Sequence, residues 1–173
     1  MIIILSGEIG IGKSSVCRRV VEDATRLGIT CGGIVTTKTP AGDIAVSDIA
    51  SGEQRLLAEQ RCRPDRPNAG RYYFDPSAVA FGVAAIERGN AAELLLVDEL
   101  GYLEIHGGGF ASVISLISAR DKPSLVVIRK ALLPAFIPGF FPVSPVVTVT
   151  LENRDFITPQ VMAQLFPVTD KAG

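Results

Sequence analysis

A glycine-rich segment near the start of the chain has residue types and spacing that suit phosphate binding. It follows the short apolar run 1–6 and reads Gly7-Glu8-Ile9-Gly10-Ile11-Gly12-Lys13-Ser14-Ser15. This fits G-x-x-x-x-G-K-[ST], in which glycines let backbone N–H groups turn toward a phosphate that side chains would obstruct. Lys13 would bring a positive charge to the β- and γ-phosphates, and Ser14 a hydroxyl to Mg²⁺. The alternative is a turn without a ligand, but an apolar run before it and a helical pattern after it favour a P-loop.

Two adjacent carboxylates, Asp98 and Glu99, follow the apolar run Leu94-Leu95-Leu96-Val97. Such a run predicts a buried parallel strand whose carboxyl end faces the ligand crevice of an α/β sheet. Many buried strands end in an acid, so the pattern gains its weight from the P-loop upstream. Together they predict a Walker B strand, with Asp98 on Mg²⁺ and Glu99 as the base that polarises the attacking water. The second acid favours hydrolysis, because a nucleotide switch or small-molecule kinase needs only the aspartate.

Other polar residues follow predicted strands. Arg129 ends the run 125–128 and is either a catalytic group that senses or stabilises γ-phosphate charge or a surface cation. Asn153 and Arg154 are candidates for contact with the base or ribose, or they belong to a helix-entry turn held by local hydrogen bonds. His106 lies close after the acidic pair, but a lone histidine there is more typical of a surface residue.

Four arginines lie in the loop 60–71, at positions 61, 63, 66 and 71. They fit either a lid that closes on phosphates or a solvated, mobile excursion, and we favour the second interpretation.

The elements that must position these groups can be read along the chain. Helical spacing of Val16, Val20, Ala24 and Leu27, stopped by Gly28, predicts the helix behind the P-loop. Strands are expected at 31–37, 43–50, 54–58 and 72–74, the first two as an antiparallel hairpin. Asp75-Pro76 predicts the start of a helix that ends near residue 89.

The second half of the chain alternates in the same way. A helix after residues 107–109, with Phe110, Val113, Ile114 and Ile117 on one face, precedes the strand 125–128. Three prolines, at 134, 138 and 142, are expected to break up the apolar stretch that follows. The last core strand is expected at 146–151, and Thr158-Pro159 would cap a closing helix.

Composition bounds the class of protein. The 173 residues are 47% hydrophobic and 20% charged with a net charge of −1, which indicates one globular domain over 1–173. We expect no nucleic-acid binding, because there is no long basic run, and no membrane span, because no segment has about 18 apolar residues. Three scattered cysteines suggest neither a metal cage nor a disulfide framework, so a cytoplasmic location fits best. A monomer is expected, and a protein partner is unknown.

Several segments, taken in order, resemble the THEP1-type nucleoside-triphosphatase family of P-loop proteins. Besides the P-loop, they are Gly32-Gly33-Ile34-Val35-Thr36, Ala50-Ser51-Gly52-Glu53, Gly70-Arg71-Tyr72-Tyr73-Phe74, Asp98-Glu99-Leu100-Gly101-Tyr102-Leu103-Glu104-Ile105 and Thr150-Leu151-Glu152-Asn153-Arg154-Asp155. The Asp98–Ile105 segment, which answers the family pattern D-E-[IL]-G-x-[ML]-E-[LI], is the most specific of these. The chain departs from the family at Thr37-Lys38-Thr39 and at Tyr102, and these departures bear on substrate preference.

The resemblance implies a three-layer α/β P-loop NTPase fold, with a mostly parallel central sheet and an antiparallel excursion near 31–75. It also implies that one strand, the one ending at Arg129, separates the P-loop strand from the Walker B strand. The implied function is Mg²⁺-dependent hydrolysis of a nucleoside triphosphate such as ATP or GTP, with broad base preference. Two alternatives stay open: a small nucleotide or metabolite kinase with the arginine loop as its lid, and a non-catalytic, nucleotide-dependent binding module.

Overall fold

The computed structural model describes residues 1–167, apart from the side chain of Glu99. Within these residues nine strands form one sheet in the order β5-β6-β4-β3-β2-β7-β8-β1-β9. The parallel strands are β1 (Ile2–Gly7), β2 (Cys31–Lys38), β7 (Leu94–Leu100), β8 (Ser124–Arg129) and β9 (Val146–Thr148). Antiparallel pairing extends the sheet beyond β2 through β3 (Ile44–Asp48), β4 (Gln54–Glu59), β6 (Tyr72–Phe74) and β5 (Asn68–Ala69). The expected parallel sheet with an antiparallel excursion is confirmed.

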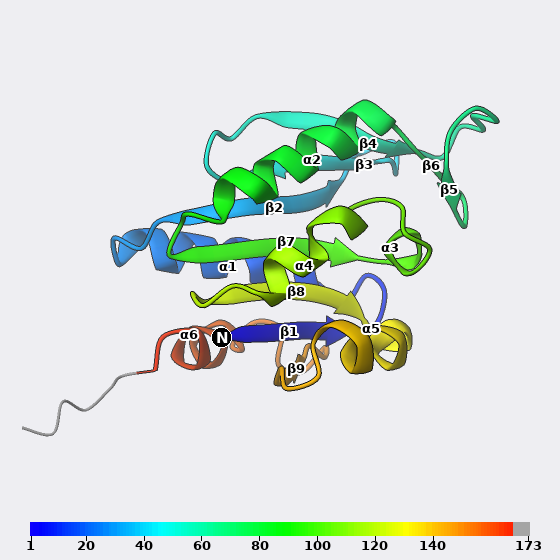
Figure 1. Cartoon of the computed structure of the whole chain (residues 1–173). Helices are drawn as coiled ribbons and strands as arrows, with labels where there is room; N and C mark the ends of the chain where they lie inside the picture. The colour runs from blue at the N-terminus through cyan, green and yellow to red at the C-terminus, as the bar shows by residue number, and fades with distance from the viewer. Residues whose placement is uncertain (168–173) are drawn as a thin grey trace, which may run out of the picture.

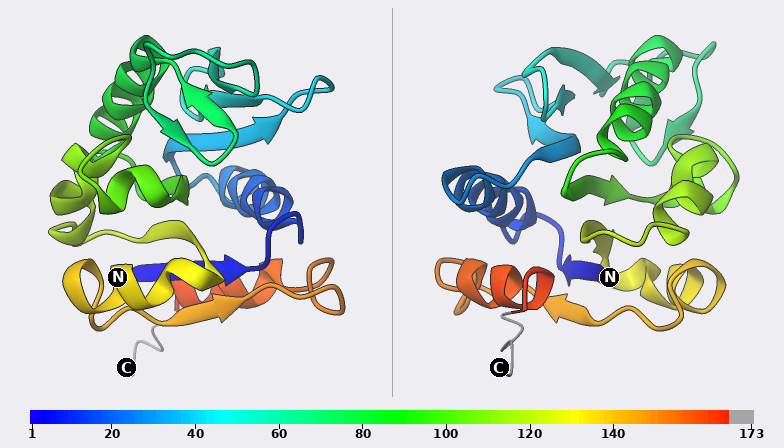
Figure 2. Two further views of the ribbon diagram at one scale, coloured as in Figure 1. Left: turned by 90° about the vertical axis from the view of Figure 1, so that its right-hand side faces the viewer. Right: turned by 60° about the vertical axis from the view of Figure 1, so that its left-hand side comes forward.

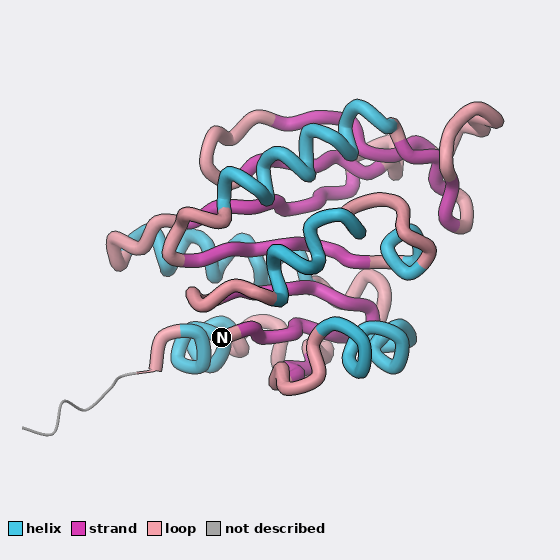
Figure 3. The backbone as a smooth tube through the Cα atoms, viewed as in Figure 1, coloured by secondary structure: helices cyan, strands magenta, loops and turns pink. Residues whose placement is uncertain are grey.

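Helices cover both faces of this sheet and give the expected three layers (Figures 1, 2 and 3). One face packs against α1 (Lys13–Arg26) and α6 (Thr158–Leu165), and the other against α2 (Pro76–Gly89), α4 (Ile114–Ser118) and α5 (Leu133–Phe140). The short helix α3 (Tyr102–Ile105) and the 3₁₀ turns η1 (Ala111–Val113) and η2 (Lys130–Leu132) complete the helical segments of the described chain. Among the residues described, none of the helices has the length and apolar character needed to cross a membrane.

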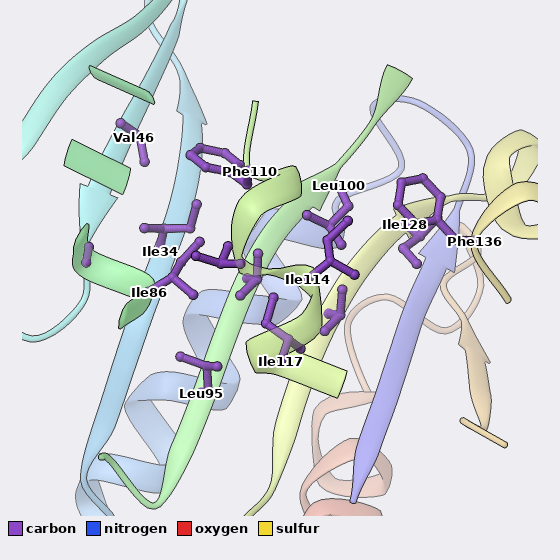
Figure 4. Close-up of a cluster of buried hydrophobic side chains, with 14 of the residues drawn as sticks. Ile34, Val46, Ile86, Leu95, Leu100, Phe110, Ile114, Ile117, Ile128 and Phe136 are labelled. Carbon is purple, nitrogen blue, oxygen red and sulfur yellow. The ribbon is translucent and has the colours of Figure 1, made fainter. Parts of the chain in front are cut away.

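The core strands are apolar throughout because both of their faces are buried. In β7, Leu95 and Val97 belong to the cluster under α2 and α4, which Figure 4 shows, whereas Leu94 and Leu96 belong to the cluster under α1 and α6. All four side chains are fully buried. Burial of one such side chain contributes about 1.5–3 kcal/mol, so the run that delivers Asp98 is fixed firmly in the sheet.

Helix α2 is seated on β2 by a contact between two glycines. A Cβ added at Gly32 would lie 2.5 Å from the Cα of Gly89, which leaves no room for a side chain at either position. At its other end α2 begins as expected, with the Asp75 carboxylate accepting hydrogen bonds from the N–H groups of Ser77 and Ala78. The helix therefore fixes the position of β2 and, through it, the strand end near Asp98.

Parallel pairing places the carboxyl ends of β2, β7, β8, β1 and β9 along one edge of the sheet. Figure 2, left, looks onto this edge, where the loop after β1 and the β5–β6 hairpin both lie. Strand β8 pairs with β1 on one side and with β7 on the other, so the predicted separation of the P-loop strand from the Walker B strand is confirmed.

Three expectations about the elements are wrong. Two of the three prolines do not break the apolar stretch: Pro134 falls in the first turn of α5, where an N–H has no helical partner, and burial of Phe136 holds the helix despite Pro138. Pro142 follows the end of α5, as expected. Strand β9 stops at Thr148 instead of residue 151, because its neighbour β1 turns away into the P-loop. Thr158 does not cap the closing helix: it is the first residue of α6, and the N-cap is Ile157, which makes no side-chain cap hydrogen bond.

Candidate active site

The loop between β1 and α1 owes its path to glycines with left-handed backbone angles. Gly10 has φ 77° and Gly12 has φ 107°, values that residues with a Cβ rarely adopt. Gly12 is also the N-cap of α1, and as a glycine it brings no side-chain cap to that helix end. The N-terminus of α1, where Lys13, Ser14 and Ser15 line the cleft, is the positive end of the helix dipole and therefore suits an anion.

Lys13 lies along the inner side of this loop. Its side chain is buried, and Nζ donates to the carbonyl oxygens of Gly7 at 3.0 Å and Glu8 at 2.8 Å. The ammonium group is thus held beside the helix N-terminus. This is where a triphosphate on the loop would carry its β- and γ-phosphates.

Asp98 stands at the carboxyl end of β7 and is held by the neighbouring strand. Its carboxylate is 1% exposed, and Oδ2 accepts hydrogen bonds from Thr36 N at 3.1 Å and Thr36 Oγ1 at 3.2 Å. Charge-assisted bonds of this kind orient a carboxylate. Sequence reasoning assigned no role to Thr36, because its contact with Asp98 depends on which strands pair.

Glu99 occupies an irregularity in the β7–β8 ladder. Asp98 pairs with Val127 and Leu100 pairs with Ile128, so Glu99 is the extra residue of a bulge. Bulges of this kind recur beside active sites. The side chain of Glu99, which we expect to be the catalytic base, lies outside the described part of the structure. Arg129, the end of β8, pairs in register with Gly7 at the start of the P-loop.

One cleft of about 650 Å³ joins these groups. Its walls come from the P-loop, the carboxyl ends of β2, β7 and β8, the loop 101–110 and the antiparallel excursion. The predicted site residues that line it are Ile9, Gly10, Gly12, Lys13, Ser14, Ser15, Asp98 and Arg129. The other three P-loop residues, Gly7, Glu8 and Ile11, line a second depression of about 200 Å³ beside β9.

Glu104 shapes the cleft wall formed by loop 101–110. Its carboxylate is buried and accepts hydrogen bonds from Gly101 N at 2.6 Å and Phe110 N at 2.9 Å. Gly109, with φ 55°, passes so close to this carboxylate that a Cβ there would overlap Glu104 Oε1. The Glu104 carboxylate thus links the two ends of the loop 101–110 that follows Glu99. In the sequence, Glu104 was noted only as part of the Asp98–Ile105 segment, and no role was predicted for it.

Asn153 and Arg154, which were predicted to contact the base or ribose, have different roles in the turn after β9. The Asn153 side chain is engaged within the turn, where Oδ1 accepts from Thr150 N at 2.8 Å and Nδ2 donates to Thr148 O at 2.9 Å. The Arg154 carbonyl accepts from the Arg19 guanidinium on α1. The Arg154 side chain runs beside the P-loop, because its Cδ would lie 3.6 Å from a Cβ at Gly12.

Of the four loop arginines, Arg71 alone lines the cleft among the residues described. Arg63 and Arg66 pair with Glu59 at 3.3 and 3.0 Å, and Arg66 also pairs with Asp75 at 2.7 Å. Arg61 is exposed, as is His106, which agrees with the surface interpretation of that histidine.

A buried thiol underlies the P-loop. Burial, and then the negative charge of Asp98, raises the pKa of Cys17 well above its usual value. The thiol is therefore neutral at pH 7 and packs as an apolar group in the cluster under α1.

The comparisons with known proteins agree with this architecture. Two nucleoside-triphosphatases THEP1 are similar over almost their full length: that of Thermococcus kodakarensis is 28% identical, covering 94% of this chain and 95% of the relative. That of Thermofilum pendens is 29% identical and covers 94% and 93%. The crystal structure of THEP1 from Aquifex aeolicus superimposes with a TM-score of 0.80 at 20% identity, covering 96% of this chain and 99% of that one. The solution structure of a human cancer-related nucleoside triphosphatase gives 0.70 at 18% identity, covering 96% and 98%.

At these identities the two structures establish the fold alone. The family itself follows from the sequence, because the family model described as NTPase matches residues 2–162. The chain belongs to this NTPase family.

Proposed function

We propose that the protein hydrolyses nucleoside triphosphates to the diphosphate and phosphate in the P-loop cleft, with Mg²⁺ bound to the substrate. The observation that carries the proposal is that Lys13, Ser14, Asp98 and Arg129 all line one cleft. The names of the THEP1 relatives, nucleoside-triphosphatases, support the same reaction class.

Charge stabilisation falls to the P-loop. Its backbone N–H groups, the N-terminus of α1 and the Lys13 ammonium would bind the phosphates and oppose the charge that develops as the bond to the γ-phosphate breaks. Lys13 now donates to two loop carbonyls, so its ammonium is already positioned before a phosphate arrives.

Ser14 and Asp98 suit a magnesium ion. Mg²⁺ prefers oxygen ligands and binds through one or two protein groups plus phosphates and waters, instead of an all-protein cage. The described residues hold no group of three or more His, Cys, Asp or Glu side chains that would form such a cage. When bound, the ion would neutralise negative charge on the phosphates, and the hydrogen bonds from Thr36 would hold the Asp98 carboxylate in place as its ligand.

Glu99 and Arg129 complete the proposal. Glu99 follows Asp98 on the same strand, and as a carboxylate it would take the proton of the attacking water. Its place in a backbone bulge supports a functional position. Arg129, adjacent to Gly7 in the sheet, would stabilise charge on the γ-phosphate.

Arg154 is our candidate for contact with the ribose or base, because its side chain runs beside Gly12. Asn153 would act indirectly by holding the turn that presents Arg154. The proposal treats the chain as one cytoplasmic, monomeric domain, as expected from the sequence.

Phosphate release should be measured with ATP, GTP, CTP and UTP, each with and without Mg²⁺. We expect Mg²⁺-dependent release with several bases and its near-complete loss in Lys13→Ala. The matched control is Lys122→Ala, an exposed lysine whose Nζ donates to Ala91 O at 2.8 Å, away from the cleft. An unchanged rate in Lys13→Ala would remove the P-loop from the mechanism. Transfer of phosphate to an added acceptor instead of water would identify a phosphotransferase.

A further inference from the structure

The cleft extends well beyond the residues that bind phosphate. Past Asp98 it continues along the end of β2 to a region that we call the distal half, lined by Ile44, Leu57, Arg71, Tyr72, Phe74 and Phe110. These residues come from the antiparallel excursion and from the loop 101–110. None of them takes part in the hydrolysis proposed above.

The distal half lies on the far side of the reacting phosphate from the nucleoside. A triphosphate on a P-loop has its β- and γ-phosphates at the lysine and its metal at the serine hydroxyl. Asp98 belongs to β7 and Arg129 to β8, so the γ-phosphate of a bound triphosphate would face these strands and its nucleoside would extend away from them. The part of the cleft beyond Asp98 is therefore left for a different molecule. This step rests on the proposed function, because it takes the P-loop as the triphosphate site.

The walls of the distal half suit a planar, apolar group. Leu57 and Phe110 are each 3% exposed and belong to the core cluster, and Ile44 and Phe74 pack against it half-buried. In Figure 4 Phe110 lies on the side of that cluster that holds Val46 and Ile34. Aromatic and aliphatic side chains around a concave opening are typical of sites for a ring.

A cation is positioned at the edge of this apolar wall. The Arg71 guanidinium lies 5.3 Å from the centre of the Tyr72 ring and donates to Tyr72 Oη at 3.3 Å. Tyr72 in turn donates to Gly42 O at 3.2 Å, which ties the pair to the β2–β3 turn. Lys38, at the end of β2, also lines the cleft. An anionic substituent next to a ring would match this arrangement.

We propose that the distal half binds a second small molecule, a nucleoside monophosphate, while a triphosphate occupies the P-loop. Its base would lie against Phe74 and Phe110, and its phosphate would pair with Arg71. No transfer of phosphate to this molecule is part of the proposal. The volume of about 650 Å³ is that of the whole cleft, which the two molecules would share.

The test uses the full chain saturated with Mg²⁺ and a β,γ-imido triphosphate, which blocks the P-loop without turnover. AMP and GMP are titrated into this complex by calorimetry. We expect saturable binding of at least one monophosphate, weakened about tenfold in Arg71→Ala and retained in large part by Arg71→Lys, which keeps the charge. Arg61→Ala removes an exposed arginine of the same loop that is outside the cleft lining, and should bind like the parent.

Three results would overturn the inference. They are no binding at millimolar monophosphate, displacement of the triphosphate analogue by the monophosphate, and equal affinity in Arg71→Ala and the parent. Because Arg71 is exposed, its replacement leaves the folded core intact, which a thermal melt of each variant checks. ATP hydrolysis by the same preparation is measured in parallel, so that a failed second site is distinguished from a failed P-loop site.

Discussion

Replacing Thr36 by valine tests whether the strand next to Asp98 prepares the metal ligand. Valine keeps the β-branched shape of threonine but removes the hydroxyl that donates to Asp98 Oδ2 at 3.2 Å, while the Thr36 N–H bond at 3.1 Å stays. Because Asp98 is only 1% exposed, water cannot readily replace the lost donor. The substitution therefore leaves a buried carboxylate with one hydrogen bond fewer.

Two quantities should change. A hydrogen bond to a charged group contributes about 1.5–3 kcal/mol, and the length of this one favours the lower end, so we expect about 1.5 kcal/mol less free energy of unfolding. For a chain of this size that corresponds to a melting temperature lower by roughly 3–6 °C. Loss of a group that orients a metal ligand typically costs about 10–100-fold in metal affinity, so the Mg²⁺ concentration needed for half-maximal phosphate release should rise at least about tenfold.

Thermal denaturation of the free protein and a Mg²⁺ titration of phosphate release measure the two effects separately. Thr36→Ser is the control, because it restores the hydroxyl and should recover most of the Mg²⁺ dependence. A Thr36→Val variant that melts and titrates like the parent would refute the view that Thr36 holds Asp98 for the metal. A lower melting temperature with an unchanged Mg²⁺ requirement would limit Thr36 to a structural role.

Glu99→Gln should still bind triphosphate and Mg²⁺ in calorimetry but release phosphate about 10²–10⁴-fold more slowly, because it has lost the general base. Asp98→Asn should weaken Mg²⁺ binding as well as slow phosphate release. Equal turnover in Glu99→Gln and the parent would exclude Glu99 as the base. Gly109→Ala should lower the free energy of unfolding by about 1–3 kcal/mol, because it combines a left-handed backbone with overlap against Glu104, and a chemical denaturation curve that superimposes on the parent would contradict this. Cys17 should resist iodoacetamide at pH 8 until denaturant is added, since burial both shields the thiol and raises its pKa. Rapid labelling of the Cys17 peptide in the native protein, followed by mass spectrometry separately from the exposed Cys62, would disprove that.

The sequence is most informative where one segment carries both a pattern and its own structure. The P-loop is recognised from glycines and a lysine that lie within one short segment, residues 7–15. The Walker B strand is recognised from an unbroken apolar run that ends in two acids. Both follow from local rules of backbone freedom and burial. The order of the strands came from the resemblance to a family, since no local rule decides which of several buried strands become neighbours.

What the sequence could not reveal are contacts between distant segments. Thr36 and Asp98 are 62 positions apart, and they meet only because β2 pairs in parallel with β7. The distal half of the cleft likewise joins β4, β6 and the loop 101–110, which share no motif. The error at Pro138 has the same origin, because the buried Phe136 outweighs a local preference against helix.

The parallel part of the sheet and the antiparallel excursion differ in how many segments of the chain form them. The phosphate-binding groups come from separate segments at residues 7–15, 98–99 and 129, whereas strands β3 to β6 are one continuous stretch, 44–74. A continuous stretch that pairs with the parallel sheet at the single strand β2 could be exchanged as one unit if its buried contacts with α2 are preserved. Chimaeras that exchange this stretch between relatives would vary the small molecules recognised while the triphosphate chemistry is inherited unchanged, which makes the excursion the natural unit for library design.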